Sequence, residues 1–267
     1  MQDGIRTLTE TDLNTLTTTK QSQYGAIGVT EDGRRFRYVS FGGTSTIAPG
    51  LIVTAAALTA NFQAMAITAS GTGGQVAANY AGSQSGFGLL VLTNSSSTAI
   101  TADQFAEGFL DIIVGGASAD TGHYTYRIRG NTAAGAGNVT ATYCTVYLAE
   151  SFRHTTALVP GTDTANLRIS DYSTVNTSTT AALPIGLTIN PVPNTATVTN
   201  YGWVQVGGDC VVLNDAGGTI TVGGAFGQSV STAGNVVAAT ASTHPIIGYT
   251  KIAISASTSA PAWLSLA

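Results

Sequence analysis

The sequence predicts an all-β protein of short antiparallel strands joined by glycine-rich turns, with little helix. Only 9% of the 267 residues are charged, against about 25% in ordinary globular domains, and such a chain cannot supply the solvated surface of long helices. Its 32 glycines punctuate short runs of Val, Ile, Leu and Thr, which is the pattern of strands and turns. Short strands in this number favour a β-sandwich or a small β-barrel.

The C-terminal stretch 201–266 shows this pattern most clearly. Two apolar runs flank Gly207-Gly208-Asp209, which predicts a β-hairpin. Further strands are expected at 219–222, 235–239, 246–249 and 261–266. A Pro-containing segment before this stretch predicts a boundary near residue 195. We therefore expect an N-terminal arm at 1–22, a main β domain at 23–195 and a small β domain at 196–267.

The arm is polar and rich in Thr. Thr9-Glu10-Thr11-Asp12 predicts a capped short helix through Leu16, and the arm as a whole is either a frayed terminus or a segment that orders against a neighbouring subunit. Strands at 24–29 and 35–41 flank Glu31-Asp32-Gly33, whose Asp-Gly pair predicts a type I′ hairpin.

The same hairpin carries Arg34, Arg35 and Arg37. By the period of two in a strand, Arg35 and Arg37 share one face while Phe36 and Tyr38 share the other. These arginines indicate either a solvated strand face or a contact with an acidic protein surface, because Arg suits interface pairing.

The middle of the chain adds further strands at 88–92, 109–114, 123–130, 138–148 and 167–170. Residues 181–187 and 191–193 then lead as a semi-rigid Pro segment into the C-terminal stretch. The segments 123–130 and 138–148 alternate in a way that predicts neighbouring antiparallel strands. Residues 101–110 are either a helix, with Thr101 and Gln104 as a capping box, or a turn that leads into the next strand. The apolar window 50–69 is interrupted by Thr, Asn and Gln, which predicts a buried strand pair and no membrane span.

Motifs for enzyme chemistry are weak. The three histidines, His123, His154 and His244, lie in separate segments without a local metal-binding spacing. Gly82-Ser83-Gln84-Ser85-Gly86 matches a nucleophile elbow but lies in a low-complexity loop with no strand–helix context. Cys144 and Cys210 sit inside apolar strand patterns and are interpreted as buried thiols rather than a disulfide. No cofactor and no metal are expected.

The net charge of the chain and its first residues limit the expected binding partners and cellular location. The net charge of −4 disfavours nucleic-acid binding, which calls for a basic domain. Met1–Arg6 lack the basic and apolar regions of a secretory signal, so we expect synthesis in a cytoplasm without export.

Several short motifs together resemble the head decoration, or cement, proteins of tailed bacteriophages. They are Asp-Gly-Arg-Arg-Phe-Arg-Tyr at 32–38, Ala-Pro-Gly-Leu-Ile-Val at 48–53, Thr-Gly-His-Tyr-Thr-Tyr-Arg-Ile at 121–128, Asn-Val-Thr-Ala-Thr at 138–142 and Tyr-Gly-Trp-Val-Gln-Val-Gly-Gly at 201–208. The resemblance implies sandwich, barrel or tulip-like β subdomains on the outer capsid surface. It implies homotrimers that hold neighbouring major capsid subunits together, and no catalytic residues.

Three functions compete on the sequence: a capsid decoration protein, another virion β protein of the tail, baseplate or fibre, and a carbohydrate-binding β-sandwich. Exposed loop aromatics such as Tyr80, Phe87 and Tyr172 would serve the third. A major capsid protein is disfavoured, because no segment sustains a long helical period. We expect a non-enzymatic virion protein that binds the major capsid protein and its own copies, with no nucleic acid and no membrane as partners and a host-surface glycan left open. The expected interface residues are Arg6, Arg34, Arg35, Arg37 and Tyr38.

Overall fold

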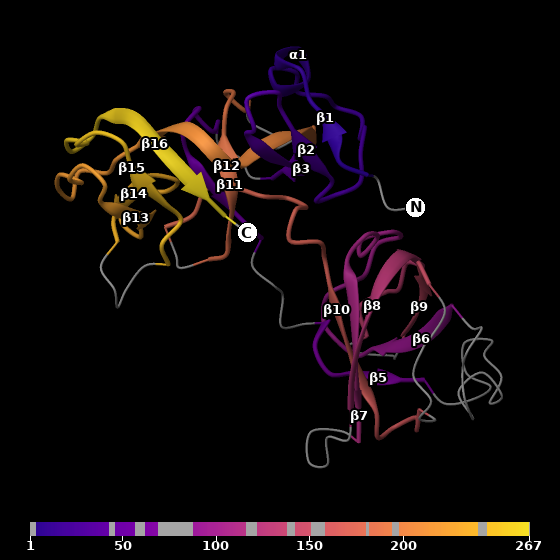
Figure 1. Ribbon diagram of the computed structural model, residues 1–267. Helices are drawn as coiled ribbons and strands as arrows, with labels where there is room; N and C mark the ends of the chain where they lie inside the picture. Colours follow the sequence, from indigo (N-terminus) through magenta and orange to yellow (C-terminus); the bar gives the residue numbers. More distant parts are fainter. Residues whose placement is uncertain are drawn as a thin grey trace. The chain divides into compact units, whose positions relative to one another are not determined.

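The computed structural model describes residues 4–42, 46–56, 62–68, 88–115, 122–137, 142–150, 158–179, 182–193, 198–239 and 245–266. The chain forms two compact units. Unit 1 combines Met1–Ala57 with Asp171–Ala267, and unit 2 is Leu58–Ser170. Unit 2 is therefore an insertion in the sequence of unit 1. The predicted all-β class is confirmed (Figure 1).

Unit 1 is built on a ten-stranded sheet, and its central path runs β1-β2-β3-β12-β16-β15-β13-β14. Strands β11 and β4 join it beside β12. The strands are β1 Arg6–Thr7, β2 Ile27–Val29, β3 Arg35–Phe41, β4 Ile52–Thr54, β11 Pro184–Thr188, β12 Asn200–Leu213, β13 Ala225–Gln228, β14 Val236–Ala238, β15 Gly248–Thr250 and β16 Ser259–Ser265.

Strand β12 organises unit 1, because it pairs with β3, β11 and β16. The hairpin predicted at Gly207-Gly208-Asp209 is wrong, since β12 continues through these residues to Leu213. Gly208 takes a positive φ of 93°, and the register with β3 shifts between Gln205 and Gly207. The glycine pair thus forms a bulge that bends one long strand, whereas the sequence predicts a hairpin turn at this position.

The pairing of β12 also shows that the chain does not divide into units at the predicted boundary near residue 195. Residues 200–207 pair with β3, which lies at Arg35–Phe41, so segments on both sides of 195 share one sheet. A linear sequence pattern does not reveal such a long-range pairing, and the Pro-containing segment is a connection inside unit 1.

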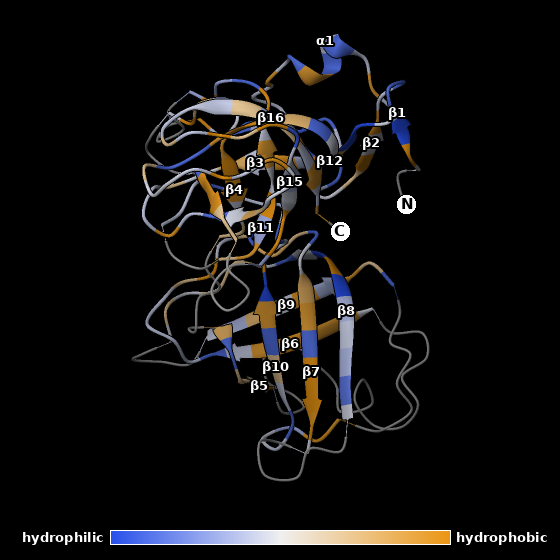
Figure 2. Ribbon diagram, turned by 60° about the vertical axis from the view of Figure 1, so that its left-hand side comes forward, coloured by the Kyte–Doolittle hydropathy of each residue, from blue (hydrophilic) through white to orange (hydrophobic). Residues whose placement is uncertain are grey.

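Unit 2 is a closed antiparallel barrel in the order β10-β5-β6-β9-β8-β7. Its strands are β5 Met65–Ile67, β6 Leu89–Asn94, β7 Phe109–Val114, β8 Gly122–Asn131, β9 Thr142–Leu148 and β10 Thr164–Arg168. In Figure 2, β7 is mostly hydrophobic in colour and β8 mostly white to blue. Leu90, Leu92, Leu110 and Ile112 are fully buried in its core, each contributing about 1.5–3 kcal/mol. The predicted antiparallel pairing of β8 with β9 is confirmed.

Two other expectations change with this division. The apolar window 50–69 does hold two buried strands, but β4 belongs to unit 1 and pairs with β11, whereas β5 belongs to the barrel. Residues 102–107 are turns that lead into β7, which is the second of the two alternatives. Thr101 and Gln104 interact at the start of these turns, where the backbone N–H of Thr101 donates to Gln104 Oε1 at 2.9 Å.

The described part of the N-terminal arm packs on unit 1. Helix α1, Glu10–Leu13, begins at the predicted cap, because the Thr9 hydroxyl accepts from the Asp12 N–H and the Asp12 carboxylate accepts from the Thr9 N–H. The helix is shorter than expected and ends before Leu16. Leu8 and Leu13 are buried against Phe36, Tyr38 and Trp203. The segment therefore packs on its own sheet and is not a frayed end.

In unit 1, residues 219–222 form no strand, and Ile220 makes only an isolated bridge with Ile254. The strands predicted at 235–239, 246–249 and 261–266 correspond to β14, β15 and β16 with shifted ends.

Candidate interaction surface

The arginine-rich hairpin begins with a turn that differs from the predicted type I′. The Gly33 N–H donates to Thr30 O and the Thr30 N–H to Arg34 O, at 3.0 and 3.1 Å. Gly33 has a φ of 84°, whereas Asp32 is not among the described residues with positive φ. This is a three-residue loop with a left-handed glycine, in which Asp32 keeps ordinary backbone angles. A single Asp-Gly pair does not distinguish the two turns.

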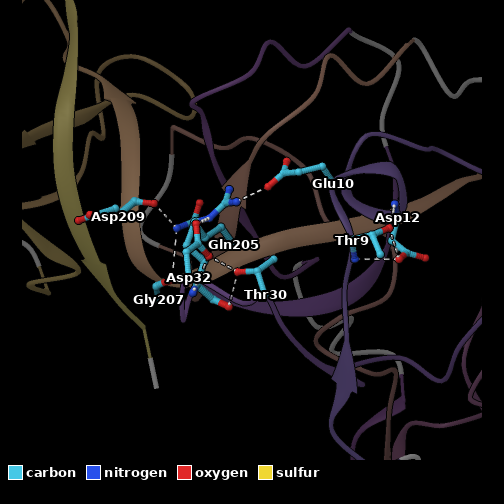
Figure 3. A network of polar contacts seen from close by, with 9 residues as sticks. Thr9, Glu10, Asp12, Thr30, Asp32, Gln205, Gly207 and Asp209 are labelled. Atoms are coloured by element: carbon cyan, nitrogen blue, oxygen red, sulfur yellow. Dashed lines mark hydrogen bonds and ion pairs between the residues drawn. The ribbon is translucent and has the colours of Figure 1, made fainter.

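The Arg34 guanidinium is held by two carboxylates. Its Nε donates to Asp32 Oδ2 at 2.7 Å, and Nη2 donates to Glu10 Oε1, so the turn is tied to helix α1 (Figure 3). Burial disfavours the charged guanidinium, but the hydrogen bonds to Glu10 and Asp32 outweigh it and raise the pKa of Arg34. The Thr30 hydroxyl is the main cause that holds the pKa of Asp32 below its usual value. Arg34 and Asp32 are therefore charged at neutral pH.

Arg35 is exposed, as Arg6 is, and its side chain lies over the bulge of β12. A Cβ on Gly207 would lie 2.7 Å from Arg35 Nε, and a Cβ on Gly208 would lie 3.1 Å from the Arg34 Cα. The Gln205 side chain fixes the same bulge by donating to Gly207 O and Asp209 O at 3.2 and 2.6 Å (Figure 3). The glycine pair thus lets the start of β3 approach the bent strand closely.

The remaining predicted interface residues have partners inside unit 1. Arg6 pairs with Asp12 at 2.6 Å. Arg37 donates to Gly25 O at 2.9 Å and lies 5.7 Å from the centre of the Tyr172 ring. Tyr38 is only 2% exposed, and its hydroxyl accepts from the Gln21 N–H. The predicted face pattern of β3 is confirmed, with Phe36 and Tyr38 inward, and this places Tyr38 in the core rather than on a surface.

The hairpin that carries Arg34 lines one side of a hollow of about 630 Å³ on unit 1. Buried Leu187 and Gln205 form its floor, while Val211 is 53% exposed beside it. The carboxylates of Asp32 and Asp209 have side chains 57% and 62% exposed and stand at its rim. The other lining residues are Arg34, Pro49, Gly50, Thr188, Ile189, Cys210 and Ser259. We call this the β12 hollow. Sequence reasoning found only its arginine, because its walls come from segments far apart in the chain.

A second feature, an exposed row across β12, β16 and β15, was missed by sequence reasoning. Trp263 pairs directly with Asp209 on one side and with Tyr249 on the other, so the three side chains share one face of the sheet. Trp263 and Tyr249 are 49% and 48% exposed. Strand β16 alternates strictly between exposed and buried residues, and the sequence Pro261-Ala262-Trp263-Leu264 already carried that signal.

The cysteines and the described histidine show no reactive arrangement. Cys144 and Cys210 are both free thiols; Cys144 is buried, and Cys210 is only half-buried, contrary to the prediction. Burial raises the pKa of Cys144 to about 11 and that of Cys210 to about 12. In the described part of the chain, no three His, Cys, Asp or Glu side chains are grouped to hold a metal ion. His123 lies exposed on β8, while His154, His244, Tyr80, Phe87 and the 82–86 motif lie outside the described residues.

Comparisons with protein-family models, with curated proteins and with solved structures give no match. Of the helices within the described ranges, none has the length and apolar character needed to cross a membrane.

Proposed function

We propose that the protein is a non-enzymatic structural component of a tailed-phage virion. It binds the outer surface of the capsid, as a homotrimer, and stabilises contacts between major capsid subunits. The sequence motifs described above support this proposal, and the β12 hollow is the observation that carries it.

The β12 hollow has the anatomy of a protein-binding site. Protein interfaces combine an apolar centre with a polar rim, and their strongest contacts are anchor side chains that fill pockets. The buried Leu187 and the half-exposed Val211 supply the apolar part, and Asp32 and Asp209 supply the charged rim. The volume of about 630 Å³ leaves room for anchor side chains of a capsid subunit.

The insertion of unit 2 suits a protein that binds the capsid through one of its two units. Strands β4 and β11, which precede and follow the insertion in the chain, pair with each other inside unit 1. The barrel has its own core and closes its own sheet, so unit 1 can hold the capsid without depending on the barrel for its fold.

The test is co-sedimentation with undecorated capsids, using two variants of the same residue type. Val211→Lys places a charge beside the floor of the β12 hollow, whereas Val222→Lys does so at a site that is 68% exposed and outside the hollow. We expect saturable binding that Val211→Lys weakens at least tenfold, which corresponds to about 1.4 kcal/mol, and that Val222→Lys leaves unchanged.

Light scattering on the purified chain measures the oligomeric state in the same experiment. A chain that does not bind capsids refutes the proposal, and binding to isolated tails instead of capsids supports a tail component. Capsid binding that is equal in both variants places the contact outside the β12 hollow.

A further inference from the structure

We propose that the exposed row on β12, β16 and β15 is a binding platform for a neutral pyranose oligosaccharide. The platform consists of Trp263 and Tyr249, flanked by Asp209 and Lys251. It shares Asp209 with the rim of the β12 hollow, but neither aromatic ring lines that hollow.

The two rings are held in place by the sheet and remain open to a ligand. Trp263 and Tyr249 are direct partners in an antiparallel ladder, which holds their Cβ atoms about 5 Å apart. Both are about half-exposed. The inward aromatic residues of unit 1 behave differently: Tyr38 stacks on Tyr201 and contacts Trp203 edge-on at 5.2 Å. In the described part of the chain, Trp263 and Tyr249 have no such ring partner.

Two charged groups lie next to the indole ring of Trp263. Lys251 forms an ion pair with Asp209, and its Nζ lies 5.8 Å from the centre of the Trp263 ring. That separation lies within the roughly 6 Å of a weak cation–π contact. A ring face therefore lies beside one strong hydrogen-bond donor and one strong acceptor.

This combination fits a sugar better than a protein partner. Two half-exposed aromatic rings offer roughly 150–250 Å² in total, from the 150–250 Å² that each buries when fully enclosed. A stable protein interface needs about 800 Å² from each side, and the centres of such interfaces are poor in Lys and Asp. A pyranose presents an apolar C–H face of ring size and a rim of hydroxyls that both donate and accept.

The charge and the width of the platform limit the class of sugar that it can bind. Asp209 and Lys251 carry opposite charges and cancel, so a neutral sugar is favoured over a uronate. Two neighbouring rings about 5 Å apart at Cβ match one or two consecutive pyranose units. With few contacts and an open site, we expect dissociation constants in the millimolar range, and avidity in an oligomer would raise the effective affinity.

The test is saturation-transfer NMR on the full chain with lactose, maltose and cellobiose, and with glucuronate as a charged control. We expect signals from ring C–H protons of at least one neutral disaccharide and weaker signals from glucuronate. Trp263→Ala and Tyr249→Ala should each reduce binding at least tenfold. Trp263→Phe should retain part of it, and the matched surface change Val222→Ala should have no effect.

Thermal melts of each variant separate loss of binding from loss of fold. Trp263→Phe keeps an aromatic ring in the ladder, so it remains informative if Trp263→Ala unfolds. The proposal is overturned if none of the neutral sugars gives a signal, or if Trp263→Ala and Trp263→Phe bind as well as the unmodified chain. It is also overturned if the unmodified chain self-associates in solution and Trp263→Ala abolishes that association, since the row is then a contact between copies.

Discussion

Gly108→Ala should destabilise unit 2 and leave unit 1 unchanged. Gly108 lies where the turns at 102–107 enter β7, and its carbonyl accepts from the Ile128 N–H at 2.9 Å. A Cβ at this position would lie 2.1 Å from Arg168 O and 2.9 Å from Phe105 O. Both atoms belong to the backbone, so the barrel itself must shift to admit the methyl group.

The expected cost follows from overpacking of a closed structure. Forced insertion of a methyl group costs about 1–3 kcal/mol. The lower entropy of the unfolded alanine chain returns about 0.4–1 kcal/mol where the backbone angles suit it, and Gly108 is not among the glycines with positive φ. A net loss of about 1–2 kcal/mol shifts the melting temperature of a domain of this size by several degrees.

Differential scanning calorimetry measures this shift in melting temperature, and we expect one transition for each unit. Hydrogen exchange followed by mass spectrometry then assigns the shifted transition to the barrel. Gly88→Ala is the matched control in the same unit, because its Cβ would meet only Glu150 O and Leu148 O at 4.0 Å. Equal shifts of both transitions would refute the independence of the units, and an unchanged melt would refute the steric argument.

Three further predictions concern unit 1 and the thiols. The Thr9 N–H and hydroxyl lower the pKa of Asp12, so the ionised carboxylate stabilises α1 above the pKa that Asp12 has in the unfolded chain. This stabilisation is lost as the pH falls through the lowered pKa of the folded state, and amide exchange in residues 8–14 should therefore accelerate below about pH 4. Asp12→Asn should remove that pH dependence. Replacing Leu58–Ser170 with a short Gly-Ser linker should leave unit 1 folded, with β4 still paired to β11, as judged by a single retained calorimetric transition; loss of that transition contradicts the insertion model. Cys144 and Cys210, whose pKa values are raised to about 11 and about 12, should resist alkylation at pH 8 until the chain is denatured, and rapid labelling of the native protein would contradict these raised pKa values.

Local patterns predicted the strands well because a strand is defined by neighbours in the sequence. The alternation in Arg35–Phe41 identified β3 and the inward face of Phe36 and Tyr38, and the Thr9–Asp12 spacing identified the start of α1. The same reasoning failed at Gly207-Gly208. A glycine pair permits either a chain reversal or a bulge, and only the close approach of Arg34 and of Arg35 at the start of β3 requires the bulge.

The predicted interface residues show the same limit of sequence reasoning, because the sequence does not reveal the partners of their charged groups. The sequence marked Arg6, Arg34 and Arg37 as available cations, but the fold supplies Asp12, Glu10 and the Gly25 carbonyl as their partners. Whether a charge is free depends on which oxygen atoms the fold brings within hydrogen-bonding distance. The spacing of these residues in the sequence predicted none of these pairs.

By itself the sequence determined that this is an all-β chain, because low charge, frequent glycine and short β-branched runs act locally through backbone preference and side-chain alternation. Only the tertiary structure decided that unit 2 is a closed barrel inserted between β4 and β11, and that β12 joins segments on both sides of it. Only the tertiary structure formed the β12 hollow and placed Trp263 beside Tyr249 and Asp209. The physical reason is that strand pairing is chosen by burial and register between distant segments, and no property of either segment alone specifies its partner.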